Sequence, residues 1–181
     1  RWFYTSSGNL VIGGKSSIQN DELIKRLKSE KKDFIVMHTS SPGSPFSVIL
    51  SDTATLKDKK ECAIFTACFS KAWKQRKRKA KIDIFNLSQL YKIKGMKKGT
   101  WGVRGKVERV IVELSLVLTK QEDSLRAVPE SAAKKILLKI APGKVDKSLM
   151  LSKLAVELGN YKQDDILSAL PPGGLKIIKN D

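Results

Sequence analysis

Histidine, cysteine and long apolar runs are all scarce in this sequence. Its 181 residues include one His and two Cys, too few for the sets of four Cys and His ligands that hold structural zinc. No apolar run approaches the roughly 20 residues that a membrane-spanning helix needs, and no signal-peptide pattern follows Arg1. We therefore expect no metal, no cofactor and no membrane span. Because the chain starts with Arg1 rather than Met, a whole protein and a fragment are both compatible with it.

The two cysteines, Cys62 and Cys68, fall in one predicted helix. At this spacing a helix separates the two side chains by about one and two-thirds turns, which is too far for an unstrained disulfide. We therefore expect two reduced thiols in the core. Reduced thiols are typical of cytoplasmic proteins, so the expected location is the cytoplasm.

Acidic residues are outnumbered by basic ones, at 18 against 35, and the formal net charge is +17. The excess is concentrated in residues 71–109, where fourteen Lys and Arg stand against Asp83 and Glu108, a net +12. Aromatic residues such as Trp73 and Trp101 interrupt this basic segment, so it must be folded rather than a tail. A folded basic surface that carries aromatic side chains points to a polyanionic partner such as a nucleic acid.

Short β-prone runs alternate with helical patterns over the first two-thirds of the chain. A hairpin is predicted around Ser7 and Gly8, and apolar residues at helical spacing predict one helix over residues 18–27 and another that extends through Trp73. We therefore predict an α+β fold, with a mixed or antiparallel sheet and two packed helices. The remaining strands are expected at residues 34–38, 46–50, 82–87, 90–93, 100–105 and 109–118.

The character of the sequence changes after Thr119. A polar break at residues 120–124 is followed by one further predicted strand at 135–141, which should end in a turn at Pro142 and Gly143. Helices are then expected from Asp146 to Gly159 and from Gln163 to Leu170. We therefore predict one domain over residues 1–119 and a mainly helical C-terminal extension over residues 120–181.

Several short motifs follow one another along the chain: residues 2–15 (WFYTSSGNLVIGGK) followed by Asn20, residues 33–38 (DFIVMH), residues 69–74 (FSKAWK) and residues 92–101 (KIKGMKKGTW). In this order they resemble the NFACT-R family, the RNA-binding domain found at the C-terminal side of NFACT proteins and in stand-alone forms. The likeness covers roughly residues 1–118.

This sequence also departs from the pattern of the NFACT-R family at two places. Many members continue after the strand histidine with Ala-Asp-hydrophobic-His-Gly, whereas residues 39–43 here read TSSPG. Lys15 stands where Arg is common after the two glycines, which keeps the charge but loses the planar fork. No role that depends on the missing Asp or the second His is carried over to this chain.

The resemblance implies an RNA-binding module connected with ribosome-associated quality control, in which NFACT proteins engage tRNA and the large ribosomal subunit. The expected partners are therefore tRNA or large-subunit ribosomal RNA, and the ribosome itself. Binding to DNA through charge alone also stays open. The composition by itself indicates only a polyanion.

The basic segment supplies the first set of candidate contacts to nucleic acid. If six to ten of these cations touch phosphates, affinity should fall by about three to five orders of magnitude between 50 and 200 mM salt. A second set comes from the motifs outside the basic segment, namely Lys15, Asn20 and His38. The first set is Lys74, Arg76, Lys77, Arg78, Lys79, Lys81, Lys97, Lys98, Arg104 and Lys106, with Trp101 as a candidate for stacking on a base.

Other interpretations stay open beside non-catalytic RNA binding. A nuclease or RNA-modifying enzyme would have to use Asp33, His38 and Asp52, although no nucleophile elbow and no cluster of carboxylates is present in the sequence. A module that binds membrane surfaces or proteins is the third class. For His38 itself, packing in the core is the simpler interpretation, and a donor to a phosphate or a base is the functional one.

Overall fold

The computed structural model describes residues 1–159 and 161–178, and a six-stranded sheet forms its larger part. The strand order is β1-β2-β4-β3-β5-β8, and every neighbouring pair is antiparallel. The predicted α+β class is confirmed, and β3 is a central strand as its apolar sequence indicated. The strands are β1 (Trp2–Tyr4), β2 (Leu10–Gly13), β3 (Ile35–Thr39), β4 (Ser47–Leu50), β5 (Lys79–Asn86) and β8 (Glu108–Glu113).

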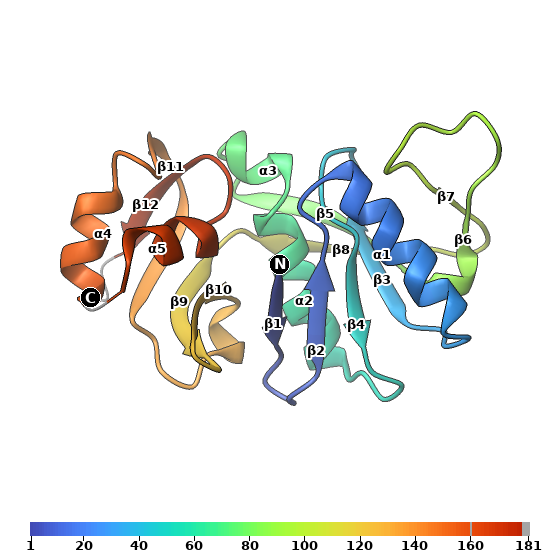
Figure 1. Cartoon of the computed structure of the whole chain (residues 1–181), viewed down its shortest axis with the longest axis horizontal. Coiled ribbons are helices and arrows are strands. Elements are labelled where there is room, and N and C mark those ends of the chain that lie inside the picture. The colour runs from blue at the N-terminus through green and yellow to red at the C-terminus, as the bar shows by residue number, and fades with distance from the viewer. Residues whose placement is uncertain (160, 179–181) are drawn as a thin grey trace.

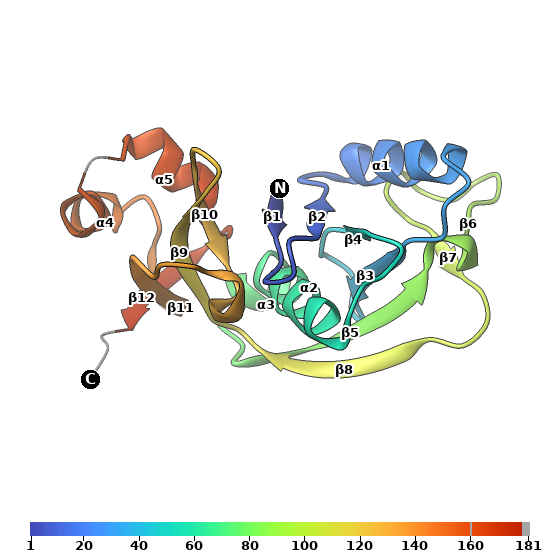
Figure 2. The same ribbon diagram turned by 90° about the horizontal axis from the view of Figure 1, so that it is seen from below.

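The two predicted helices cover opposite faces of this sheet. Helix α1 (Ser17–Ser29) packs Ile24 and Leu27 against Val36 and Phe85, and helix α2 (Leu56–Cys68) covers the other face of the same strands. Because side chains alternate along a strand, consecutive residues of β3 enter the two separate hydrophobic clusters. Figure 2 shows α1 and α2 on either side of the strands between them.

The second helix does not continue through Trp73 as predicted. It ends at Cys68, and Ser70 starts a separate short helix, α3 (Lys71–Lys74). The Ser70 hydroxyl accepts a hydrogen bond from the backbone N–H of Ala72 and donates one to the carbonyl of Ala67. A serine that satisfies the backbone at a helix start in this way competes with helix continuation. Trp73 is nevertheless fully buried, as its place in the apolar stripe predicted.

A small two-stranded sheet carries the Lys/Gly-rich segment. The 3-10 turn η1 (Leu87–Gln89) leads into β6 (Leu90–Tyr91), which pairs with β7 (Gly102–Val103). Both strands are shorter than predicted, and the loop between them lies next to α1 at the opposite end of the molecule from α4 and α5 (Figure 1).

The predicted long strand over residues 109–118 is two strands in two different sheets. Strand β8 ends at Glu113, and β9 (Leu116–Gln121) belongs to a second sheet. The chain changes sheet at Leu114, whose N–H donates to the carbonyl of Arg78 and whose side chain is buried. Figure 2 shows β8 running along the molecule to the point where β9 begins. No Gly or Pro marks this change, so the β-branched pattern reads as one uninterrupted strand.

The C-terminal part is not mainly helical, which corrects the prediction from sequence. Its strands form a four-stranded antiparallel sheet in the order β10-β9-β11-β12. Two helices, α4 (Leu151–Leu158) and α5 (Gln163–Ala169), and a 3-10 turn, η2 (Glu130–Ala132), accompany the sheet, and Gly159 ends α4 as predicted. Residues 160 and 179–181 of the predicted extension lie outside the described residues. The strands after β9 are β10 (Ser124–Val128), β11 (Leu138–Asp146) and β12 (Gly174–Ile178).

The turn predicted at Pro142 and Gly143 is instead a bulge inside β11. The register opposite Leu175 shifts between Pro142 and Val145, and Gly143 lies so close to the Leu175 backbone that a Cβ there would be 2.3 Å from it. A proline without an N–H and a glycine without a side chain are both tolerated at such a bulge.

One hydrophobic cluster joins the two sheets. It includes Phe3 from the first sheet, Leu116 from the second and Leu154 from α4. The indole N–H of Trp73 also donates to the carbonyl of Gly174, over 2.9 Å. Strand β9 passes through residue 119, and the division of the chain into two domains there stays a prediction. None of the helices in the described ranges has the length and apolarity needed to cross a membrane.

Candidate functional site

A groove with a volume of about 680 Å³ lies at the end of the six-stranded sheet where β2 and β3 end and β4 begins. It is on the face of the sheet that carries α1, because His38, Asp83 and Phe85 alternate onto that face. Four other segments complete its walls: the start of α1, the loop at residues 40–45, α3, and the β6–β7 loop. Pro172, from the C-terminal part, also lines it.

The groove brings together six of the residues predicted from sequence, from positions far apart in the chain. Lys71, which was not among the predicted contacts, joins them because it begins α3 and packs its side chain against Gly43. The six predicted residues in the groove are Lys15, Asn20, His38, Lys74, Lys98 and Trp101.

The other predicted cations lie outside the groove lining but are solvent-exposed. Five of them follow Lys74 from the end of α3 into β5, and Lys79 among these forms an ion pair with Glu113 over 3.5 Å. Such an exposed pair contributes about 0–1 kcal/mol, so it does not hold Lys79 away from a partner. The set outside the groove is Arg76, Lys77, Arg78, Lys79, Lys81, Lys97, Arg104 and Lys106.

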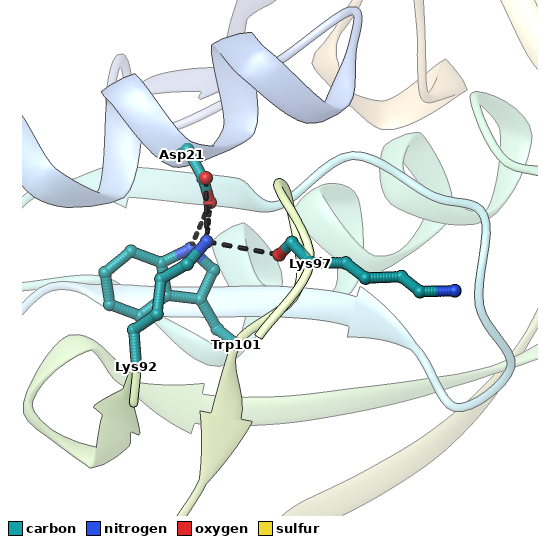
Figure 3. A network of polar contacts seen from close by, with 4 residues as sticks. All are labelled: Asp21, Lys92, Lys97 and Trp101. Atoms are coloured by element: carbon teal, nitrogen blue, oxygen red, sulfur yellow. Dashed lines mark hydrogen bonds and ion pairs between the residues drawn. The ribbon is translucent and has the colours of Figure 1, made fainter. Parts of the chain in front are cut away.

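The Lys/Gly-rich loop is attached to α1 through the buried carboxylate of Asp21. The Lys92 ammonium lies 2.7 Å from each carboxylate oxygen, and the indole N–H of Trp101 donates to Asp21 Oδ1 over 2.9 Å. Lys92 also donates to the carbonyl of Lys97, as Figure 3 shows, while the Lys97 side chain extends away from the network. Burial alone would raise the pKa of Asp21, but hydrogen bonds from Lys92, the Gly99 backbone and Trp101 outweigh it and lower the pKa.

This network defines what Trp101 can do. Its indole N–H is occupied by Asp21, and the Lys92 ammonium lies over its ring, 5.3 Å from the centroid. Trp101 is half-buried and packs against the cluster beneath α1, so it forms part of the groove wall. The role of Trp101 as a stacking platform for a base stays a prediction.

Sequence reasoning missed Asp21 and Lys92 as a pair. Lys92 is part of the Lys/Gly motif, but nothing local indicates that its charge is used inside the protein. Asp21 looks like an ordinary acidic residue near the start of a helix. Asp21 is only 7% exposed because a segment 71 positions later in the chain, at Lys92, packs against it. The residues next to Asp21 in the sequence give no indication of this burial.

Asn20 holds the groove wall together. It is 7% exposed, and its side-chain oxygen accepts a hydrogen bond from the backbone N–H of Phe46 over 3.3 Å. A Cβ at Gly14 would lie 2.2 Å from this same oxygen. The glycine and the asparagine in this motif therefore fit one another and join α1 to the start of β4. A direct contact from Asn20 to nucleic acid stays a prediction.

His38 and Asp83 face each other on neighbouring strands of the sheet. His38 Nδ1 lies 2.7 Å from the carbonyl oxygen of Thr39, and its ring packs on Phe46 with centroids 4.7 Å apart. Asp83 accepts hydrogen bonds from Ser40 and from Arg109, so part of its charge is neutralised. Burial lowers the pKa of His38, although the bond to Thr39 and the Asp83 charge act in the opposite direction.

The residues of the alternative enzymatic hypothesis do not form one cluster. Ile35 pairs with Ile49, so Asp33 and Asp52 both lie beyond the same end of the β3–β4 pair, and His38 lies near the other end. Asp33 accepts two hydrogen bonds from Ser88, and Asp52 pairs with Lys32. Within residues 1–159 and 161–178, no three His, Cys, Asp or Glu side chains gather closely enough to hold a metal ion.

Comparisons with known proteins show what this chain is similar to. Residues 1–105 match the family described as NFACT protein RNA binding domain. The chain is 29% identical to the archaeal Rqc2 homolog aRqcH of Methanocaldococcus jannaschii, an alignment that covers 96% of this chain and 28% of that protein. This chain therefore spans little more than a quarter of the length of that relative.

A solved structure shows a similar fold. The C-terminal part of the fibronectin/fibrinogen-binding protein from Streptococcus suis superposes with a TM-score of 0.52 and 27% sequence identity. The similarity covers 68% of this chain and 45% of that one.

Proposed function

Because this chain belongs to the NFACT protein RNA binding domain family, we propose that it binds tRNA or large-subunit ribosomal RNA through the groove and the basic surface beside it. In this proposal the domain positions RNA and does not catalyse a reaction. The setting is the cytoplasm and ribosome-associated quality control, as the resemblance to NFACT proteins implies.

The convergence of unpaired lysines on the groove supports this proposal most directly. Lys15, Lys71, Lys74 and Lys98 come from separate segments and line one groove, and within the described residues none of them forms an ion pair. Four like charges held together repel one another, which destabilises the fold unless an anion is bound. A phosphodiester backbone supplies such an anion in repeating form.

The location of the remaining cations fits the same partner. Arg76 to Lys81 continue from the groove wall at Lys74 into β5, and the side chain of Lys97, next to the groove residue Lys98, extends away from the Asp21 network (Figure 3). An RNA that enters the groove can therefore meet further positive charge on leaving it. The sequence shows no helix-turn-helix or zinc-finger pattern that would suit a DNA major groove, whereas open loops and exposed cations suit single-stranded or irregular RNA.

The test compares two charge reversals of equal size at different places. Lys15→Glu with Lys98→Glu alters the groove, and Lys57→Glu with Lys60→Glu alters exposed positions of α2 on the other face of the sheet. Both pairs change the net charge equally, so only the location differs. We expect the groove pair to weaken tRNA binding by about 10- to 100-fold and the α2 pair to change it far less.

The measurement is a titration of the full chain with tRNA, a ribosomal RNA hairpin and a DNA duplex at several salt concentrations. Equal losses from the two pairs of substitutions would show that only net charge attracts RNA and would contradict the proposed site. Absence of RNA binding by the unmodified chain at physiological salt would contradict the proposed function itself.

A further inference from the structure

The imidazole of His38 lines the groove, and within the described residues only one of its two nitrogens has a hydrogen-bond partner. Nδ1 lies 2.7 Å from the carbonyl oxygen of Thr39, and the ring packs against Phe46. These two contacts fix the orientation of the ring. Among the groups of residues 1–159 and 161–178, none forms a hydrogen bond with Nε2.

The contact with Thr39 determines which nitrogen carries the proton. A carbonyl oxygen only accepts hydrogen bonds, so Nδ1 must be the N–H donor. Burial lowers the pKa of His38, which favours the neutral ring at neutral pH. A neutral imidazole with its proton on Nδ1 has a lone pair on Nε2 and is an acceptor there. This is the reverse of the donor role that the sequence suggested for His38.

A hydrogen-bond acceptor at Nε2, in a groove lined by lysines, restricts which group of a ligand can bind to His38. Phosphate oxygens also only accept, so the neutral ring forms no hydrogen bond with them, and Lys15, Lys74 and Lys98 are the groups suited to bind phosphates. The partner of Nε2 must therefore be a hydrogen-bond donor, and the lysines around it favour a donor that belongs to the sugar–phosphate backbone. In RNA each ribose carries such a donor, the 2′-hydroxyl, and in DNA the same position carries only hydrogen.

We infer that Nε2 of His38 accepts a hydrogen bond from a ribose 2′-hydroxyl of the RNA in the groove, and that this contact distinguishes RNA from DNA. The inference rests on the proposed function, because it assigns a role to one residue of the same groove. The lysines supply affinity for any phosphodiester backbone, and His38 supplies the preference for ribose. One neutral hydrogen bond of this kind changes affinity by about 3- to 10-fold.

The test uses the full chain with three short single-stranded oligonucleotides that share the same bases: oligouridylate, oligodeoxyuridylate and the 2′-fluoro form. Fluorine at the 2′ position cannot donate a hydrogen bond. Unmodified protein should bind oligouridylate about 3- to 10-fold more tightly than either of the other two. His38→Phe should remove this preference, so that the variant binds oligouridylate and oligodeoxyuridylate with equal affinity.

Two further variants separate recognition from general binding. His38→Gln can place an amide oxygen near the position of Nε2, so it should retain part of the preference for ribose. Lys15→Ala should lower the affinity for all three oligonucleotides by the same factor, because Lys15 is proposed to contact phosphate and not the sugar. Circular dichroism and thermal unfolding establish that each variant is folded.

Several outcomes would overturn the inference. A preference for ribose that persists in His38→Phe would assign the discrimination to another residue. If the 2′-fluoro form bound as tightly as oligouridylate, the preference would come from sugar conformation and not from a hydrogen bond donated by the 2′-hydroxyl. This comparison uses the unmodified protein alone. If tRNA bound through the groove lysines but no ribose preference were found, the inference alone would fail. Failure to bind any RNA would remove the proposed function as well.

Discussion

The ammonium group of Lys92 lies 2.7 Å from both carboxylate oxygens of Asp21, a residue 71 positions earlier in the chain. Both side chains are largely buried, at 21% and 10% exposed. The pair joins the Lys/Gly-rich loop to α1, so the position of Lys98 in the groove depends on an ion pair that does not itself touch the groove. A largely buried charge that loses its partner is costly, which makes this pair sensitive to substitution.

Lys92→Met should destabilise the protein by about 1–3 kcal/mol, because Asp21 then keeps only its neutral donors. Denaturant unfolding measures this cost, and amide hydrogen exchange across residues 94–100 reports whether the loop loosens. Lys94→Met is the matched control, since Lys94 is exposed and belongs to the same loop. Combining Asp21→Asn with Lys92→Met should cost less than the sum of the two single changes. Strict additivity would show that the pair does not act as a unit.

Reversing the charges of Arg76, Lys77, Arg78 and Lys79 should abolish RNA binding and leave the fold intact. All four side chains are exposed, so no buried contact is lost. The slope of log affinity against log salt should also become shallower, by about one for each phosphate contact removed. Binding assays over a salt series measure both quantities. Unchanged affinity would remove this part of the surface from the binding site.

Asp58 should make the protein more sensitive to acid than its surface composition indicates. Burial alone would raise the pKa of Asp58, but hydrogen bonds, among them those that Oδ2 accepts from the backbone N–H and the hydroxyl of Thr55, outweigh it and lower the pKa to about 2. The ordinary pKa of an Asp side chain, which applies to the unfolded chain, is about 3.8. Because the folded value is the lower one, the stabilisation is fully present above pH 4 and is lost as the pH falls from about 4 to about 2.

The expected loss is on the order of 2 kcal/mol over this pH range. Asp58→Asn should be less stable at neutral pH and should show a correspondingly weaker dependence on pH between 4 and 2. Urea unfolding at several pH values gives both numbers. An equally steep dependence in Asp58→Asn would mean that other carboxylates cause the acid sensitivity.

Trp73→Phe should destabilise the whole molecule, by about 2–4 kcal/mol. The substitution leaves a gap at a fully buried position and deprives the carbonyl of Gly174 of its donor. Trp2→Phe is the comparison, because Trp2 is only partly buried and no hydrogen bond involves its indole N–H within the described residues. If Trp73→Phe cost no more than Trp2→Phe, the contact with β12 would contribute nothing to the fold.

The parts of the fold that sequence predicted well are those specified by neighbouring residues. The hairpin around Ser7 and Gly8 has its own turn residues, with Gly8 at φ +82, and α1 and α2 have their own apolar stripes. The basic run beginning at Lys74 is exposed because so many charges cannot be buried together. Local preferences and burial rules suffice for these features.

The features that the sequence did not predict depend on pairing between distant segments of the chain. Strands β8 and β9 look like one strand, because the chain changes sheet at Leu114 without a turn residue. Strand β12 follows two prolines and a glycine, begins with a second glycine, and becomes a strand only by pairing with β11. The groove has the same origin, since Lys15, Lys74 and Lys98 meet only after the sheet is formed.

The two buried cysteines are native sites at which local unfolding of this protein can be measured. Burial raises the pKa of the Cys62 thiol to about 12 and that of Cys68 well above its usual value, so neither thiol ionises appreciably in the folded state. Cys68 lies against the Ser115 carbonyl, where the chain passes between the sheets, and Cys62 lies one and two-thirds turns earlier in α2. The rates at which an alkylating reagent modifies Cys62 and Cys68 therefore report separately how fast each of the two positions becomes exposed. Faster modification of Cys68 would mean that the contact between the two sheets near Ser115 opens first. Equal rates would mean that the chain unfolds as a single cooperative unit.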